Sequence, residues 1–346
     1  MTDQAVFVDP SSDHFLHDRL FNINDAQLNR DGTLLPFSRL KDHFASIGIP
    51  CFTADKLRDG TERREINHYW SLGMEGHYQE LVGRTDVRLR GFLIMEPPLV
   101  RPDLYAALPH LTAAFDEVYV HNTVGDGYSL NSVNRDKLRP LFWPQPYGDV
   151  LSPYWDITQR KNKLVVIAGN HNPRSHQPEF YSERIKAVAA LSHRNGIDLF
   201  GRGWERWWSR QSLWWTYWRH RRAIMANYHG SCASKWEVLS SYRFSLCFEN
   251  MPMKGYVTEK LFDCLYAGTV PVYWGAPDIE TLVPPDAYVD MRKFKTYLEM
   301  LDHIQAMSTE QWQGMRETAR QFLASRGKDL YYDRGKGQSG DNFTCL

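Results

Sequence analysis

The sequence has few cysteines, no excess of charge and no long hydrophobic run. Its 346 residues include 5 cysteines without a C-x-x-C pair, which disfavours a disulfide framework or a zinc site. Lys+Arg and Asp+Glu both number 41. The zero net charge excludes a protein that coats nucleic acid through surplus cations, and also an acidic disordered chain.

Membrane-spanning and secretory patterns are also missing. No apolar run approaches the ~18 residues of a membrane span, and the N-terminal residues have no basic region followed by an apolar one. We therefore expect a cytoplasmic protein in a reducing compartment, with no nucleic-acid partner.

Short apolar segments alternate with helical ones along most of the chain. This alternation predicts an α/β fold with largely parallel sheets, including a helix over 104–115. Gly and Pro interrupt it over residues 122–160 and indicate a connection between domains. We expect Rossmann-like domains over 1–155 and 156–330, followed by a polar tail over 331–346.

Ligands of open parallel sheets bind beyond the carboxyl ends of the strands. This rule directs attention to Glu96, which follows the apolar run RGFLIM, to the turn 201–203, and to Glu249-Asn250 and Gly275. On its own, Glu96 is better explained as a strand-end cap or an ion pair than as a catalytic base, and Glu75 and Glu80 are nearby rivals.

The segment 242–275 carries the densest chemistry. A strand is expected to end at Glu249-Asn250, and a helix to begin near Tyr256-Val257 with Glu259 and Lys260 in its first turn. A helix N-terminus favours a phosphate, and Lys260 adds a full positive charge. Glu259 is suited to accept hydrogen bonds from sugar hydroxyls. The alternative remains that Glu259 only complements the helix dipole and that Lys260 is a solvated surface residue.

The stretch FENMPMKGYVTEKLFDCLYAGTVPVYWG resembles the signature of the α-1,3/1,4-fucosyltransferase family. The resemblance continues upstream through Gly169-Asn170-His171-Asn172, Arg184 and the turn 201–203. In the N-terminal part it is anchored by Leu93-Ile94-Met95-Glu96.

The resemblance implies a GT-B fold, in which two Rossmann-like domains face each other across a cleft. The N-terminal domain takes a glycan acceptor and the C-terminal domain binds GDP-β-L-fucose, and transfer inverts the anomeric centre. By position, Glu96 is the implied general base, and the donor is held by Arg184, Asn250, Tyr256, Glu259 and Lys260.

Arg184 and Lys260 would stabilise the departing diphosphate without an obligatory metal, so divalent ions would at most stimulate the reaction. The expected acceptor is a surface polysaccharide or lipopolysaccharide-type glycan. The alternatives are a transferase of another GDP-linked deoxysugar and a non-catalytic scaffold that binds glycans or nucleotide sugars. A sugar-nucleotide epimerase or hydrolase would need other acids near the anomeric carbon.

Residues 204–222 contain six of the 12 tryptophans and five arginines. Trp204, Trp207 or Trp208, Trp215 and Trp218 are expected near one helical face. This composition is typical of a helix that lies peripherally on the inner face of a membrane. Core packing, a wall of the acceptor site and a subunit contact are the alternatives.

Overall fold

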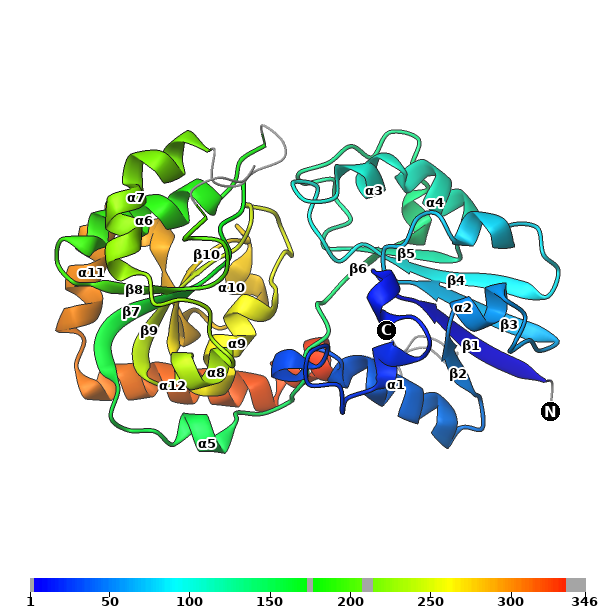
Figure 1. Ribbon diagram of the computed structural model, residues 1–346, viewed down its shortest axis with the longest axis horizontal. Coiled ribbons are helices and arrows are strands. Elements are labelled where there is room, and N and C mark those ends of the chain that lie inside the picture. Colours follow the sequence, from blue (N-terminus) through cyan, green and yellow to red (C-terminus); the bar gives the residue numbers. More distant parts are fainter. Residues whose placement is uncertain (1–2, 173–176, 207–213, 334–346) are drawn as a thin grey trace. The chain divides into compact units, whose positions relative to one another are not determined.

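The computed structural model describes residues 3–172, 177–206 and 214–333, and these form two α/β units (Figure 1). The first unit comprises residues 1–146 and 331–346, and the second comprises 147–330. In the described part of the chain no helix is long and apolar enough to cross a membrane.

The first unit contains a six-stranded parallel sheet in the order β2-β1-β3-β4-β5-β6. Apolar side chains cover both faces of this sheet in two separate clusters, which explains why β1 is almost entirely buried. The strands are β1 Gln4–Asp9, β2 Cys51–Thr53, β3 Ile66–Ser71, β4 Val87–Leu93, β5 Glu117–Val120 and β6 Leu138–Pro140. The helices of this unit are α1 Leu35–Ser46, α2 Asp55–Arg58, α3 Pro102–Ala106 and α4 Leu108–Ala114.

The single helix expected over 104–115 is wrong, because α3 and α4 are separate. Ala107 is the C-cap residue of α3 and the N-cap residue of α4. Pro109 follows at the start of α4, where its missing N–H is tolerated; inside a continuous helix it would remove a hydrogen bond.

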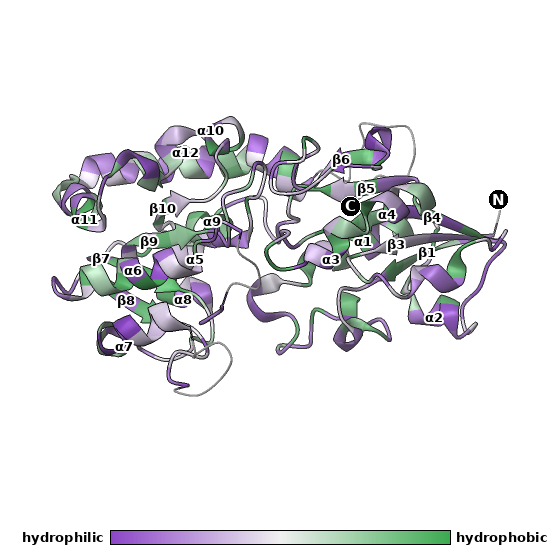
Figure 2. Ribbon diagram, turned by 90° about the horizontal axis from the view of Figure 1, so that it is seen from above, coloured by the Kyte–Doolittle hydropathy of each residue, from purple (hydrophilic) through white to green (hydrophobic). Residues whose placement is uncertain are grey.

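The second unit contains a five-stranded parallel sheet in the order β11-β10-β9-β7-β8. Figure 2 shows β8 and β9 largely in the colours of hydrophobic residues. The strands are β7 Lys161–Ile167, β8 Ile197–Phe200, β9 Tyr242–Phe248, β10 Val270–Trp274 and β11 Val289–Asp290. The helices are α5 Ser152–Trp155, α6 Tyr181–Ser192, α7 Trp215–Asn227, α8 Lys235–Leu239, α9 Glu259–Ala267, α10 Ile279–Leu282, α11 Tyr297–Ala306 and α12 Thr309–Ala324.

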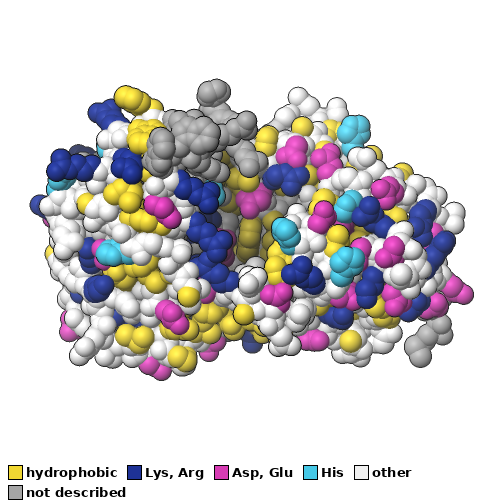
Figure 3. Space-filling model, viewed as in Figure 1, with side chains coloured by type: hydrophobic (Ala, Val, Ile, Leu, Met, Phe, Trp, Pro, Cys, Tyr) yellow, Lys and Arg dark blue, Asp and Glu magenta, His cyan; other side chains and the backbone are white. Residues whose placement is uncertain are grey.

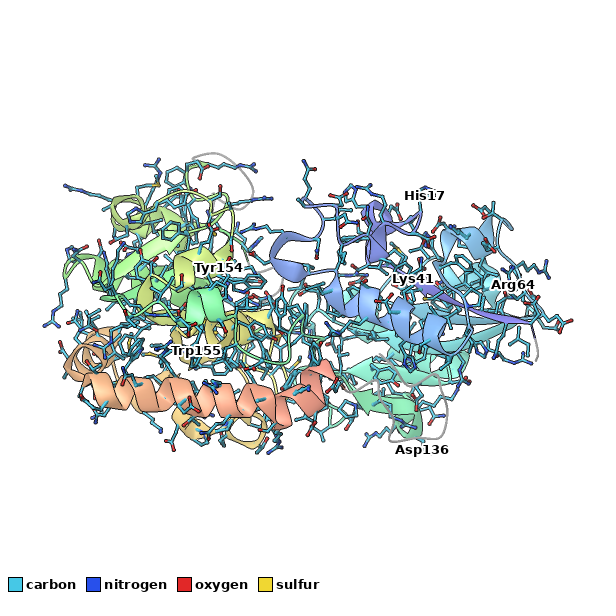
Figure 4. All side chains as sticks on the ribbon, turned by 90° about the horizontal axis from the view of Figure 1, so that it is seen from below. His17, Lys41, Arg64, Asp136, Tyr154 and Trp155 are labelled. Carbon is cyan, nitrogen blue, oxygen red and sulfur yellow. The ribbon has the colours of Figure 1, made fainter. Side chains whose placement is uncertain are left out.

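The second unit begins at residue 147 and not at the expected residue 156, because α5 packs on the second unit. The guanidinium of Arg316 lies 4.4 Å from the ring centre of Trp155, and Figure 4 shows Trp155 beside α12. The Leu151 N–H donates to the carbonyl of Tyr266 at 3.0 Å. At the other end of the chain, Tyr331 is buried in the first unit, so the second unit ends before it.

The tryptophan- and arginine-rich segment does not form one helix. Trp204 is only 2% exposed, lies outside α7, and donates from its indole nitrogen to the carbonyl of Ala168 at 2.7 Å. The expectation that Trp204 shares a helical face with Trp215 and Trp218 is therefore wrong, because Trp204 is a core residue. Trp207, Trp208 and Arg210 lie outside the described residues.

Gly201, directly after β8, packs closely against Ala168, which follows β7. Its φ is +137°, and a Cβ there would lie 1.9 Å from the carbonyl oxygen of Ala168. We expect Gly201→Ala to lower the free energy of unfolding by more than ~2 kcal/mol. Gly314→Ala is the control, because a Cβ on Gly314 in α12 meets nothing within 4 Å. That change should raise stability by ~0.5–1 kcal/mol. Urea unfolding measures both, and equal effects would contradict this packing.

Candidate functional site

A buried carboxylate stands directly after β9. The Glu249 residue is 0% exposed, and its carboxylate accepts hydrogen bonds from the N–H and the hydroxyl of Thr258, each at 2.8 Å. The ammonium of Lys260 lies 3.2 Å from the same carboxylate. A buried charge is stable only when it is paired and hydrogen-bonded, so Glu249 fixes the positions of Thr258 and Lys260.

These contacts also decide where α9 begins. Thr258 has extended backbone angles and caps the helix, whose first residue is Glu259. The expected start near Tyr256-Val257 is therefore wrong by a few residues. The Thr258 hydroxyl donates to Glu249 and accepts from the Lys260 ammonium at 2.9 Å. The Lys260 charge is thus held at the positive end of the helix dipole.

Glu259 provides a second, more exposed carboxylate for the same ammonium. Its oxygen lies 3.5 Å from Lys260, and its side chain is 36% exposed. Burial acts to raise the pKa of Glu259, but Lys260, Lys235 and a backbone N–H outweigh it, so the pKa is lowered. Glu259 is therefore charged at neutral pH.

Arg184, on α6, binds the same strand end from the other side. Its buried guanidinium donates to the carbonyl oxygens of Phe248 and Glu249 at 2.6 and 2.7 Å, and to the Asn250 amide oxygen at 3.1 Å. Burial lowers the pKa of Arg184. Within the described residues its Nη1 makes no hydrogen bond, so the two N–H groups of this nitrogen can donate to a ligand.

Asn250 continues this network to Tyr256. The Asn250 amide nitrogen donates to the Tyr256 hydroxyl at 3.1 Å, and the Tyr256 side chain is buried. The structure therefore brings together all five residues predicted to hold the donor, in one group around Arg184 and another around Lys260. Glu249 joins the two groups through its carbonyl and its carboxylate.

Gly275, after β10, closes the site around Glu249. A Cβ at this position would lie 2.5 Å from the Cγ of Glu249 and 2.3 Å from the Tyr273 hydroxyl oxygen. A side chain at position 275 would therefore displace the buried carboxylate.

The predicted base, Glu96, belongs to the first unit and follows β4. Its carbonyl accepts from the Tyr105 hydroxyl at 3.2 Å. The pKa of Arg101 is raised foremost by its hydrogen bonds to Asp103, and Glu75 and Glu96 add to this effect. The rival Glu80 forms an ion pair with Arg58 at 3.2 Å, which gives it a structural partner.

Residues 3–172, 177–206 and 214–333 contain no group of three His, Cys, Asp or Glu side chains that could hold a metal ion.

Residues 158–316 match the profile of the family described as "Glycosyltransferase family 10 (fucosyltransferase) C-term". The chain carries a glycosyltransferase family 10 domain. All five predicted donor residues lie inside this domain, and Glu96 lies outside it. The sequence resemblance to the fucosyltransferase family is thereby confirmed.

Two curated relatives align with parts of the chain. An α-(1,3)-fucosyltransferase of Helicobacter pylori is 42% identical over 76 residues, which is 22% of this chain and 16% of that protein. Human α-(1,3)-fucosyltransferase 7 is 38% identical over 176 residues, which is 49% of this chain and 42% of that protein. The aligned parts therefore span less than half of either relative.

The fold also matches a solved structure. A crystal structure of an α1,3-fucosyltransferase superposes with a TM-score of 0.52 and 15% identity, over 95% of this chain and 90% of that chain. This likeness and the two parallel-sheet units confirm the predicted GT-B fold class.

The sequence drew attention to Glu249 as a strand-end residue but assigned it no role in the site, and it did not point to Thr258. Both stand inside the quoted motif, Glu249 in F-E-N and Thr258 in Y-V-T-E-K. A strand-end acid followed by a cap and a lysine is the signal that points to them.

The two carboxylates around Lys260 allow a matched comparison. Glu249→Gln removes the buried partner, so we expect a loss of ~2–4 kcal/mol in the free energy of unfolding. Glu259→Gln removes a partly exposed partner, which should cost under ~1 kcal/mol. Urea unfolding at neutral pH measures both. Equal losses would show that Glu249 does not organise this strand end.

Proposed function

We propose that this protein is an inverting fucosyltransferase that moves L-fucose from GDP-β-L-fucose to a glycan hydroxyl in α-1,3 or α-1,4 linkage. The observation that carries the proposal is the Lys260 ammonium, held at the start of α9 in a family 10 domain. A positive charge at a helix N-terminus is suited to a diphosphate.

In this proposal the donor binds at the end of β9. Lys260, the N-terminus of α9 and the Nη1 of Arg184 stabilise the negative charge that builds on the diphosphate. Asn250 and Tyr256 hold the donor, and the charged Glu259 accepts hydrogen bonds from sugar hydroxyls. Because protein cations carry the charge stabilisation, transfer requires no metal cofactor, and divalent ions at most stimulate it.

The transfer step needs one base. The Glu96 carboxylate takes the proton of the acceptor hydroxyl while the oxygen attacks the anomeric carbon. The bond from that carbon to the diphosphate breaks at the same time, and its electron pair leaves with GDP. Attack opposite the leaving group converts the β-linked donor into an α-linked fucoside.

The proposed acceptor is a surface polysaccharide or lipopolysaccharide-type glycan, and α7 supports work at a membrane surface. Trp215, 76% exposed, lies with Arg219 and Arg222 along one exposed stripe of this helix. Among the described residues, neither arginine has an ion pair or hydrogen bond, and α7 contains no Asp or Glu. Figure 3 shows Lys and Arg side chains beside hydrophobic ones in the region of α7. The stripe therefore suits peripheral contact with anionic lipid on the inner face of a membrane.

The function is tested by transfer from GDP-fucose to an array of glycans. Glu96→Gln keeps the shape of the side chain but cannot take the proton, so transfer should fall by ~10²-fold or more. GDP should still raise the melting temperature of this variant, whereas UDP should not. Glu80→Gln is the control and should transfer normally. Full activity of the Glu96 variant, or no product from the wild type with any acceptor, would contradict the proposal.

The membrane contact is tested by cosedimentation with anionic vesicles. Binding should weaken as salt rises, and the triple change Trp215→Ser, Arg219→Gln and Arg222→Gln should abolish it, since each near-surface Arg contributes ~1 kcal/mol. Transfer to a soluble acceptor should be unaffected. Leu298→Ser, at an exposed apolar side chain of α11, is the control. Unchanged vesicle binding by the triple variant would disprove the α7 contact.

A further inference from the structure

A second buried carboxylate, Asp9, ends β1 in the first unit. It is 0% exposed, and its Oδ2 accepts a hydrogen bond from the Tyr69 hydroxyl at 2.5 Å. The Nδ1 of His77 lies 3.1 Å from both carboxylate oxygens. Burial raises the pKa of Asp9, although the hydrogen bonds from Tyr69 and His77 oppose this rise.

The Asp9 carboxylate determines which nitrogen of His77 carries the proton. An acceptor next to Nδ1 favours the tautomer that is protonated there, which leaves the lone pair of a neutral imidazole on Nε2. In the described part of the chain, this Nε2 has no hydrogen-bond partner. The His77 side chain is 19% exposed, so the ring reaches the surface of the unit.

His77 lies on the same edge of the sheet as Glu96. The segment 72–77 follows β3, Glu96 follows β4, and these strands are adjacent, with Ser71 paired to Phe92. Arg101 connects the two segments, because its guanidinium donates to the Gly73 carbonyl at 3.4 Å. Ligands of open parallel sheets bind beyond this edge, where the carboxyl ends of the strands lie.

The charges around His77 define the ligand. Glu75 and Glu96 both act on Arg101, which is hydrogen-bonded to Asp103, and Arg58 near Asp9 is paired with Glu80. The acidic residues disfavour an anion here. A neutral Nε2 requires a hydrogen-bond donor, and a sugar hydroxyl is an uncharged donor of this kind.

We propose that His77, oriented by Asp9, binds the acceptor by accepting a hydrogen bond from one of its sugar hydroxyls. This inference rests on the proposed function, in which Glu96 deprotonates another hydroxyl of the same acceptor. Asp9 is then a positioning residue, and His77 contributes to acceptor specificity.

His77→Asn tests this role, because the Asn amide nitrogen can replace Nδ1 towards Asp9 while nothing replaces Nε2. Losing one neutral hydrogen bond should raise the acceptor KM by about 5- to 10-fold. The KM for GDP-fucose and the slow hydrolysis of GDP-fucose by water should stay unchanged. His77→Gln can place an amide oxygen near the position of Nε2, so it should recover part of the acceptor affinity.

His17 supplies the matched control. Its Nδ1 lies 3.0 Å from Asp55, but its side chain is 80% exposed, and Figure 4 labels it in the segment between β1 and α1. His17→Asn should leave the acceptor KM unchanged. An unchanged acceptor KM in a folded His77→Asn variant would overturn the proposal.

Two further measurements separate this proposal from the proposed function. If the wild type transfers no fucose, direct binding of array glycans is compared between wild type and His77→Asn, and equal binding overturns the His77 role. If His77→Asn does not fold, His77→Ala takes its place, and an unchanged acceptor KM in that variant would overturn the role of His77.

Discussion

The buried carboxylate of Glu249 is the constraint on which the end of β9 depends. It has no access to water, so the protein itself must supply hydrogen-bond donors and a positive charge. Thr258 and Lys260 supply them, and both come from the far side of a loop that must fold back towards the strand. This requirement sets the start of α9 and the place of the Lys260 ammonium together.

Arg184 strengthens the same strand end by a different interaction. Its guanidinium donates hydrogen bonds to the carbonyl oxygens of Phe248 and Glu249. One cation therefore holds backbone carbonyl groups, and the other holds a carboxylate. Polar groups fixed in this way before a ligand arrives need little reorganisation during a reaction.

The sequence predicted much of the framework, because apolar runs and caps are local signals. The strand Ile197–Phe200 ends directly before the turn 201–203 that the sequence placed at a strand end, and the strand Tyr242–Phe248 ends one residue before the expected Glu249-Asn250. The strand Ile66–Ser71 was not predicted, because it buries polar residues such as Asn67 that do not read as an apolar run.

The candidate site was predictable where a motif carried it and not where side-chain direction decided it. Four of the five predicted donor residues came from one contiguous signature, and the fifth is Arg184, upstream of it. Glu249 and its contact with Lys260 depend on how the loop after β9 returns, which spacing alone does not show. Trp204 was assigned to a helix for a similar reason: composition indicated an interface, whereas packing against Ala168 placed it in the core.

The most direct test of the account is a calorimetric titration of GDP. Lys260→Ala removes the ammonium that Glu249 and Thr258 hold, so GDP affinity should fall by about 30-fold or more. Lys161→Ala removes the same charge at the start of β7, beside the Tyr242 hydroxyl, and should bind GDP as the wild type does. Equal GDP affinity of the wild type and the Lys260 variant would contradict the claim that the end of β9 is the donor site.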